Sequence, residues 1–278
     1  MNPIYLFEAG STKTTLLINK AGKTIEHHLP GFNPNRYSAE FEEQLKATIQ
    51  IENDAKIFFF GSGLVEEENK KIVKELIYNL YRITPVVYDD VTGAARAVLG
   101  DNAGLVAIMG TGGVAAYYDG TKIIKRNGGY GYLIDDYGGG LELGKILLSK
   151  WLNNDLDANV DVAITDFVKT PKSDFIIELY QNIDLKIIAG VVKIIPQFLD
   201  NSKIDELVKN YFTEFFKRHV LSLTTFYKQN TIAIIGSIGA NFQDIITGEA
   251  QKFGIKVTKF DNEPAKALLD YHLKKTSV

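Results

Sequence analysis

The chain has 278 residues, 45% of them hydrophobic and 23% charged, so it is long enough for two packed domains with substantial cores. Its net charge of -3 provides no broad positive field, which argues against nucleic acid or an anionic membrane surface as the main partner. The lack of cysteine excludes disulfides, iron–sulfur clusters and thiolate zinc sites, and the lack of a basic-then-apolar N-terminus or of ~18 consecutive apolar residues leads us to expect a cytoplasmic protein without membrane segments.

The first hundred residues predict a meander of strands followed by alternating helices and strands. Apolar alternation predicts three antiparallel strands over 4–7, 14–19 and 24–29, with turns between them. The segments that follow predict, in chain order, a helix over 38–49 with Ser38 as its cap, a strand over 57–60, a helix over 66–81, a strand over 85–88 and a helix over 91–99.

The same order of elements begins again at Gly104. The predicted elements are strands over 105–109, 113–118 and 122–125, a helical region over 141–228, a strand over 231–235, a helix over 241–253, a strand over 255–260 and a closing helix over 264–274. This order predicts an α/β fold of two duplicated βββαβα-type lobes with a ligand cleft between them. We assign residues 1–103 to an N-terminal lobe and 104–263 to a C-terminal lobe, with 264–278 packing back on the first.

Two glycine-containing hairpins occupy equivalent places in the two lobes. Residues 8–14 link the first two strands of one lobe, and residues 110–113 link the corresponding strands of the other. Such a turn exposes consecutive backbone N–H groups and hydroxyls, which suits a phosphate group. Either hairpin alone could be an ordinary glycine turn. Their equivalent positions favour a pair that binds one polyphosphate.

Other phosphate motifs fit less well. Lys13-Thr14 and Gly22-Lys23-Thr24 resemble the end of a P-loop but lack its first glycine. Gly110-x-Gly112-x-x-Ala115 imitates a dinucleotide fingerprint, which requires a helix where we predict a strand. Gly236-Ser237-Ile238-Gly239 follows a predicted strand and opens a helix, so an adenosine could lie close to its backbone, although most such turns bind nothing.

Two acidic pairs are candidates for catalysis and metal binding. Asp89-Asp90 ends a predicted buried strand, where a carboxylate can accept the proton of an attacking hydroxyl, although Asp90 could instead cap the next helix. Asp135-Asp136 lies in the glycine-rich segment 128–140, which indicates a loop shaped around a ligand or a hydrated magnesium ion. The four histidines show no metal-ligand spacing, so we expect surface or packing roles for His27, His28, His219 and His272.

Taken in order, these segments resemble the N-acetylglucosamine kinase-like and BadF/BadG-type ATPases of the sugar kinase, Hsp70 and actin superfamily. The matching segments are 8–14, 31–34, 87–100, 110–112, 129–145, 235–238 and 264–272. The resemblance spans nearly the whole chain. It implies a two-lobed, actin-like ATPase fold of the ribonuclease H-like type. It also implies ATP-dependent phosphorylation of a hydroxyl of N-acetylglucosamine or a related amino sugar, often by a homodimer.

The resemblance further implies roles for individual residues. Asp90 would be the general base, and Glu8 and Asp136 would organise Mg²⁺ through water. ATP would be bound by Gly10, Ser11, Thr12, Lys13, Gly110, Thr111, Gly112, Gly236 and Ser237. The sugar would be contacted by Asn33, Asp90, Thr111, Gly129 and Asp136.

The chain also departs from the pattern of the family. Glu8 stands where most bacterial members have Asp, and Gly113, Val114, Tyr137 and Gly139 replace polar or charged residues. These changes remove polar groups from the predicted sugar side of the cleft, where a missing hydrogen-bond partner is costly. The alternative is therefore a nucleotide- or sugar-binding sensor or ATPase of the same fold without kinase activity. A dehydratase or reductase activator is disfavoured, since that role needs cluster-ligating cysteines.

Overall fold

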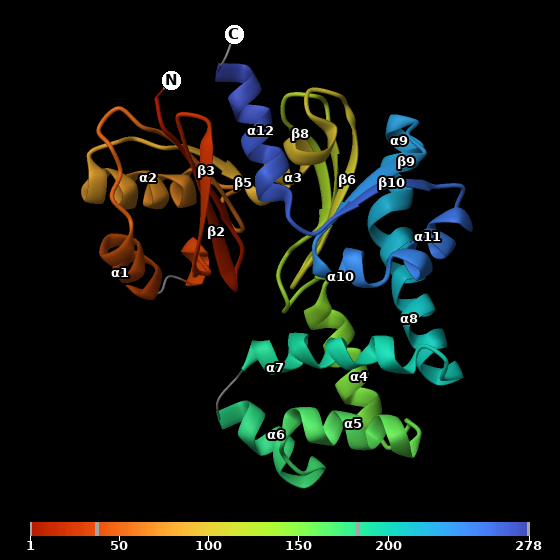
Figure 1. Cartoon of the computed structure of the whole chain (residues 1–278). Helices are drawn as coiled ribbons and strands as arrows, with labels where there is room; N and C mark the ends of the chain where they lie inside the picture. Colours follow the sequence, from red (N-terminus) through yellow and green to blue (C-terminus); the bar gives the residue numbers. More distant parts are fainter. Residues whose placement is uncertain (1, 37–38, 182–183, 277–278) are drawn as a thin grey trace. The chain divides into compact units, whose positions relative to one another are not determined.

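The computed structural model describes residues 2–36, 39–181 and 184–276, and the chain divides into two compact units (Figure 1). Unit 1 consists of Met1–Ala103, Tyr118–Ile123 and Glu263–Val278. Unit 2 consists of Gly104–Tyr117 and Ile124–Asn262. None of the helices in the described part of the chain combines the length and the apolarity that crossing a bilayer requires.

Unit 1 contains a five-stranded mixed sheet in the order β3-β2-β1-β4-β5. Its strands are β1 (Ile4–Ala9), β2 (Lys13–Lys20), β3 (Lys23–Pro30), β4 (Lys56–Gly61) and β5 (Val86–Asp89). The first three form the predicted antiparallel meander, whereas β1, β4 and β5 are parallel. The carboxyl ends of the three parallel strands therefore meet at one edge, where the register pairs Ala9 with Gly61 and Gly61 with Asp89.

Helices cover both faces of this sheet. They are η1 (Pro34–Arg36), α1 (Ala39–Thr48), α2 (Glu67–Tyr81), α3 (Asp90–Leu99) and α12 (Pro264–Thr276). Strand β1 contributes to a core on each face: Phe7 lies in one with Phe41 of α1, and Leu6 lies in the other with Leu268 of α12. The alternation of β1 thus separates two cores, as the period of a strand requires. The expected cap Ser38 lies outside the described residues.

Unit 2 repeats the topology with different side chains. Its sheet has the order β10-β9-β6-β7-β8, which is the order of unit 1 read from the other end. The strands are β6 (Gly104–Met109), β7 (Gly113–Tyr118), β8 (Ile123–Gly128), β9 (Thr231–Ile235) and β10 (Lys256–Asp261). Strands β6, β9 and β10 are parallel. The predicted α/β class with two duplicated sheets is confirmed.

The remainder of unit 2 is helical. Its helices are α4 (Gly140–Leu152), α5 (Ala158–Val168), α6 (Lys172–Gln181), α7 (Leu185–Gly190), η2 (Val191–Phe198), α8 (Ser202–Phe215), the π-helix η3 (Phe216–Val220), α9 (Leu221–Tyr227), α10 (Ser237–Asn241) and α11 (Gln243–Gln251). The helix that we predicted over 241–253 is wrong at its start, because α10 begins at Ser237 and the helical path breaks at Phe242. Phe242 has a non-helical φ of -123° and a buried side chain.

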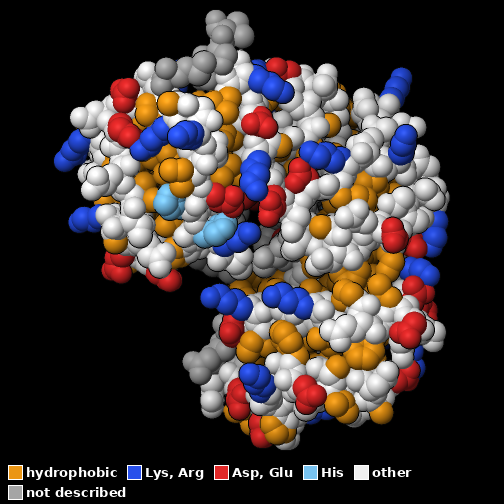
Figure 2. All heavy atoms as spheres, in the orientation of Figure 1, with side chains coloured by type: hydrophobic (Ala, Val, Ile, Leu, Met, Phe, Trp, Pro, Cys, Tyr) orange, Lys and Arg blue, Asp and Glu red, His pale blue; other side chains and the backbone are white. Residues whose placement is uncertain are grey.

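Aromatic side chains in the last turns of α8 and at the start of η3 belong to the core of unit 2. Tyr211, Phe215 and Phe216 are buried, which excludes these side chains from a surface contact. Apolar side chains are exposed instead on α5 and α6, in the lower part of the view in Figure 2, where hydrophobic atoms gather. They are Val162, Ile176, Ile177 and Tyr180.

One helix contact in unit 2 depends on a glycine. A Cβ at Gly144 of α4 would lie 1.8 Å from the carbonyl oxygen of Ile188 in α7. We expect Gly144→Ala to lower the free energy of unfolding by about 1–3 kcal/mol, because the two helices must separate. As a control, Gly248→Ala on α11, where a Cβ meets nothing within 4 Å, should raise it by about 0.5–1 kcal/mol. Urea unfolding measures both, and equal stabilities of the two variants would contradict this packing.

Candidate functional site

The hairpin between β1 and β2 presents its tip to solvent. Gly10 donates its N–H to the carbonyl of Lys13 at 2.9 Å, and Ser11, Thr12 and Lys13 are exposed. The segment after β3 packs beneath the hairpin, where a Cβ at Gly31 would lie 2.4 Å from the carbonyl oxygen of Ser11. Only glycine permits this approach. The hairpin thus has the tight, exposed form that we expected of a phosphate-binding turn.

Ser62 connects this hairpin to Asn33, and sequence reasoning missed it. The Oγ atoms of Ser11 and Ser62 are 3.2 Å apart, and Asn33 Nδ2 donates to Ser62 Oγ at 3.4 Å. The backbone N–H of Ser62 also donates to the carbonyl of Ala9 at 3.1 Å. A signal was present in the sequence, because Ser62 lies two residues after the strand predicted over 57–60, and functional residues collect at the ends of strands in α/β sheets.

The two aspartates after β5 have different environments. Asp89 is the N-cap of α3: its Oδ1 accepts from the N–H of Thr92 at 3.2 Å and its Oδ2 from the Thr92 hydroxyl at 2.6 Å. Asp90 is the first residue of the helix, and its Oδ1 accepts from the N–H of Val91 at 2.9 Å. The alternative that Asp90 caps the helix is therefore wrong, because the preceding residue has the extended backbone that a cap requires.

Glu8 interacts electrostatically with Asp90. Burial and, to a smaller extent, the carboxylate of Asp90 together raise the pKa of Glu8 to about 6, while Lys13 opposes the shift. Glu8 and Tyr88 both pair with Phe60 of the intervening strand, which places Asp90 at the same sheet edge. Two neighbouring carboxylates favour a cation or a proton between them.

Glu8→Gln is expected to stabilise the fold at alkaline pH. A carboxyl group whose pKa is raised by folding, here from 4.5 to about 6, destabilises the folded state once it ionises. At pH 8 we expect the variant to be more stable by about 1–2 kcal/mol, and this gain should disappear as the pH falls below the unfolded pKa. Urea unfolding at several pH values tests this. Glu68→Gln on the exposed side of α2 should show no such gain, and an equal gain in both variants would contradict the assignment.

The second hairpin packs on the start of α4. Gly110 donates its N–H to the carbonyl of Gly112 at 3.0 Å. The carbonyls of Gly110 and Thr111 accept from the N–H groups of Gly140 at 2.8 Å and Leu141 at 3.0 Å. The first two N–H groups of α4 therefore donate to the hairpin and are not available to a ligand. The exposed tip of the hairpin is left as the candidate phosphate contact.

Asp136 lies against this second hairpin. A Cβ at Gly112 would lie 2.9 Å from Oδ1 of Asp136, so a side chain at this position would displace the carboxylate. Burial raises the pKa of Asp136, while hydrogen bonds from the backbone of Gly113 and Gly131 oppose the shift and the neighbouring Asp135 adds to it. The structure therefore brings a predicted metal-shell residue to a predicted phosphate loop.

The predicted adenosine loop also lies beside the second hairpin. Gly236 has a φ of 110°, and a Cβ there would lie 2.5 Å from the carbonyl oxygen of Met109 and 3.1 Å from the nitrogen of Gly110. Its N–H donates to the carbonyl of Asp261 at 2.9 Å, and Ser237 begins α10. Three of the predicted segments, around residues 110, 136 and 236, thus converge within unit 2.

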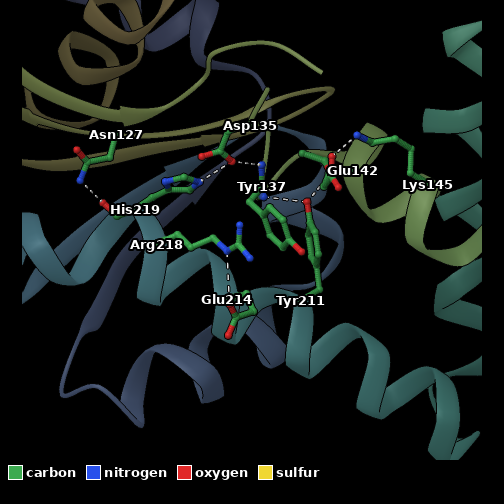
Figure 3. A network of polar contacts seen from close by, with 11 residues as sticks. Asn127, Asp135, Tyr137, Glu142, Lys145, Tyr211, Glu214, Arg218 and His219 are labelled. Carbon is green, nitrogen blue, oxygen red and sulfur yellow. Dashed lines mark hydrogen bonds and ion pairs between the residues drawn. The ribbon is translucent and has the colours of Figure 1, made fainter. Parts of the chain in front are cut away.

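Two residues that depart from the family pattern have packing roles. Tyr137 stacks on Tyr211 with ring centroids 5.3 Å apart, and the guanidinium carbon of Arg218 lies 4.2 Å from the Tyr137 ring (Figure 3). Val114 is buried beneath Gly129, whose Cβ would lie 3.0 Å from that of the valine. These side chains support the glycine-rich loop instead of providing polar groups.

The predicted site residues are divided between the units. Unit 1 holds Glu8, Gly10, Ser11, Thr12, Lys13, Asn33 and Asp90, and unit 2 holds Gly110, Thr111, Gly112, Gly129, Asp136, Gly236 and Ser237. In the described part of the chain, three or more acidic or imidazole side chains nowhere gather closely enough to hold a metal directly.

Several solved structures have a fold similar to that of this chain. No family model matches the sequence, and no curated protein matches it. A presumed N-acetylglucosamine kinase from Porphyromonas gingivalis has a TM-score of 0.85 and 25% identity, over 99% of this chain and 100% of that one.

Two more distant structures have the same fold. A presumed N-acetylglucosamine kinase from Chromobacterium violaceum has a TM-score of 0.74 and 14% identity, over 98% of this chain and 99% of that one. A ROK family glucokinase from Streptomyces griseus, solved with glucose and AMPPNP, has a TM-score of 0.58 and 13% identity, over 99% of this chain and 98% of that one. The chain therefore has the actin-like ATPase fold in the form shared by these N-acetylglucosamine kinase-like and ROK structures.

Proposed function

We propose that the chain is an ATP-dependent kinase that phosphorylates a hydroxyl of an amino sugar, N-acetylglucosamine or a related one. The likeness to the Porphyromonas protein over the whole of both chains supports the sugar class. The glucokinase that was solved with AMPPNP and glucose supports a nucleotide and a sugar as the two ligands. A cytoplasmic location and a homodimer remain predictions.

The observation that carries the proposal is the carboxylate pair in unit 1. Asp90 follows a parallel strand at the sheet edge where ligands bind in open α/β sheets, and it raises the pKa of Glu8. Asp89 provides the cap of α3, so Asp90 has no structural task as the cap. A carboxylate in this position suits a general base toward a sugar hydroxyl.

The remaining predicted residues would bind and orient the substrates. The N–H groups and hydroxyls of the two hairpins would hold phosphates, and Gly236 and Ser237 would lie against the adenosine. Glu8 and Asp136 would hold Mg²⁺ through water, and the ion would neutralise charge on the transferred phosphoryl group. Asn33, Thr111 and Gly129 would orient the sugar, and Asp90 would accept the proton of its attacking hydroxyl.

The direct test is ADP release with Mg-ATP and a panel of sugars. The panel should contain N-acetylglucosamine, N-acetylmannosamine, glucosamine and glucose. We expect release that depends on at least one amino sugar. Binding of ATP without sugar-dependent ADP release would overturn the proposal and favour the sensor, which the packing roles of Val114 and Tyr137 also support.

A further inference from the structure

The helical path between α8 and α9 contains one wide turn. Phe216–Val220 form a π-helix, a rare turn that is found often at functional sites. The turn carries Arg218 and His219 beneath the glycine-rich loop 128–140 (Figure 3). His219 is only 2% exposed. The function proposed above assigns no role to this buried imidazole.

His219 contacts the glycine-rich loop at two points. Its Nε2 lies 3.3 Å from Oδ1 of Asp135, in the second half of the loop (Figure 3). At the start of the loop, a Cβ at Gly128 would lie 2.9 Å from the Cε1 of His219. The backbone carbonyl of His219 accepts from Asn127 Nδ2 at 2.9 Å, and the same side-chain amide donates to Ser222 Oγ at 2.9 Å.

The imidazole of His219 and the carboxylate of Asp135 are within ion-pair distance, but they are not aligned for a hydrogen bond. Among the described residues, Nε2 of His219 is a buried nitrogen without an aligned hydrogen-bond partner. Burial lowers the pKa of the imidazole, and Asp135 opposes that shift. A buried nitrogen of this kind lowers the stability of a fold, which indicates that its position serves another purpose.

Aromatic packing holds the imidazole in place. Its ring lies edge-on to Phe215, with centroids 5.5 Å apart and an interplanar angle of 70°. A Cβ at Gly138 would in turn lie 2.6 Å from the Phe215 ring. The hydroxyl of Tyr211 accepts from the N–H of Gly138 at 2.8 Å and donates to the carbonyl of Gly139 at 2.6 Å. The end of the loop therefore rests on aromatic side chains of α8.

We propose that His219 is a positioning residue of the sugar site: by bridging Gly128 and Asp135 it fixes Gly129 and Asp136, which follow them in the chain. The inference rests on the proposed function, because the resemblance gives Gly129 and Asp136 their roles. His219 itself is buried behind the loop and need not touch substrate. A displacement of about 1 Å of the residues that orient a substrate is enough to weaken its binding or slow its reaction.

The kinetic test compares His219→Phe, Asp135→Asn and the double variant. Phenylalanine keeps a ring beside Phe215 but removes the nitrogen that faces Asp135. We expect each single variant to raise the KM for the sugar about tenfold, and the KM for Mg-ATP by a clearly smaller factor, because Asp136 also belongs to the predicted Mg²⁺ shell. The double variant should be no worse than either single one. An unchanged sugar KM in His219→Phe, or equal increases in the KM values of both substrates, would overturn the proposal.

Amide hydrogen exchange tests the same inference without catalysis. In His219→Phe we expect amides 129–136 of the free protein to exchange about tenfold faster, while those of β9 are unaffected. Asp135→Asn leaves the imidazole in the core. If His219→Phe fails to fold, we expect the same faster exchange of amides 129–136 in Asp135→Asn. If the parent turns over no sugar yet the loop loses protection, the proposed function fails and the positioning role stands. Unchanged protection of the loop in a folded variant would refute the role.

Discussion

Asp90→Asn is expected to lower the kcat of sugar phosphorylation by about 10²–10⁴, because an amide cannot accept the proton of the attacking hydroxyl. The substitution is nearly isosteric, and the amide oxygen can still accept from the N–H of Val91 as the carboxylate does. We therefore expect the stability and the KM for ATP to be retained. Coupled ADP-release kinetics and urea unfolding measure the two effects separately.

Asp89→Asn is the matched control, one residue earlier in the chain. Asparagine is as good an N-cap as aspartate, so its oxygen can still accept from the N–H of Thr92, and its amide nitrogen can donate to the Thr92 hydroxyl. We expect kcat to stay close to that of the parent. If Asp89→Asn abolished turnover and Asp90→Asn did not, Asp89 and not Asp90 would be the general base.

His272 should make the stability of unit 1 depend on pH between 6.5 and 4. Its ring is 6% exposed and stacks on Phe58 with centroids 3.9 Å apart. Burial lowers its pKa to about 4, and the charges of Arg96 and Lys275 act in the same direction. In this range the unfolded chain binds the proton and the folded chain does not, so acid favours unfolding. We expect this residue to cost about 3 kcal/mol of stability between pH 7 and pH 4.

The measurement is the difference between the parent and His272→Phe at each pH. Phenylalanine keeps a ring against Phe58 and cannot titrate, so the variant should lose about 3 kcal/mol less on acidification. Urea unfolding at pH 7, 5.5 and 4 gives these differences. His28→Phe is the control, because the side chain of His28 is 64% exposed. Parallel pH profiles for the parent and His272→Phe would show that burial does not hold His272 neutral.

Local patterns predicted most of the fold correctly. The strands and helices of unit 1 follow the expected segments within a few residues, because the alternation of a strand and the spacing of a helix are both local properties. The closing helix was also expected, and α12 shares a core with β1, β2 and β4 of unit 1. The predictions were less accurate at α10 and at the π-helix, where tertiary packing around Phe242 and His219 overrides helical periodicity.

The duplicated order of elements and the two glycine hairpins could be predicted from the sequence, because the apolar period and the turn residues are encoded within short segments. The sequence also indicated acids at the ends of strands. Three features became visible only in the folded chain: which acid caps α3, the link of Ser62 between Ser11 and Asn33, and the approach of His219 to Asp135. These contacts depend on the backbone conformation at each residue and on partners that are far apart in the chain. The spacing of residues in the sequence specifies neither the conformation nor the partners.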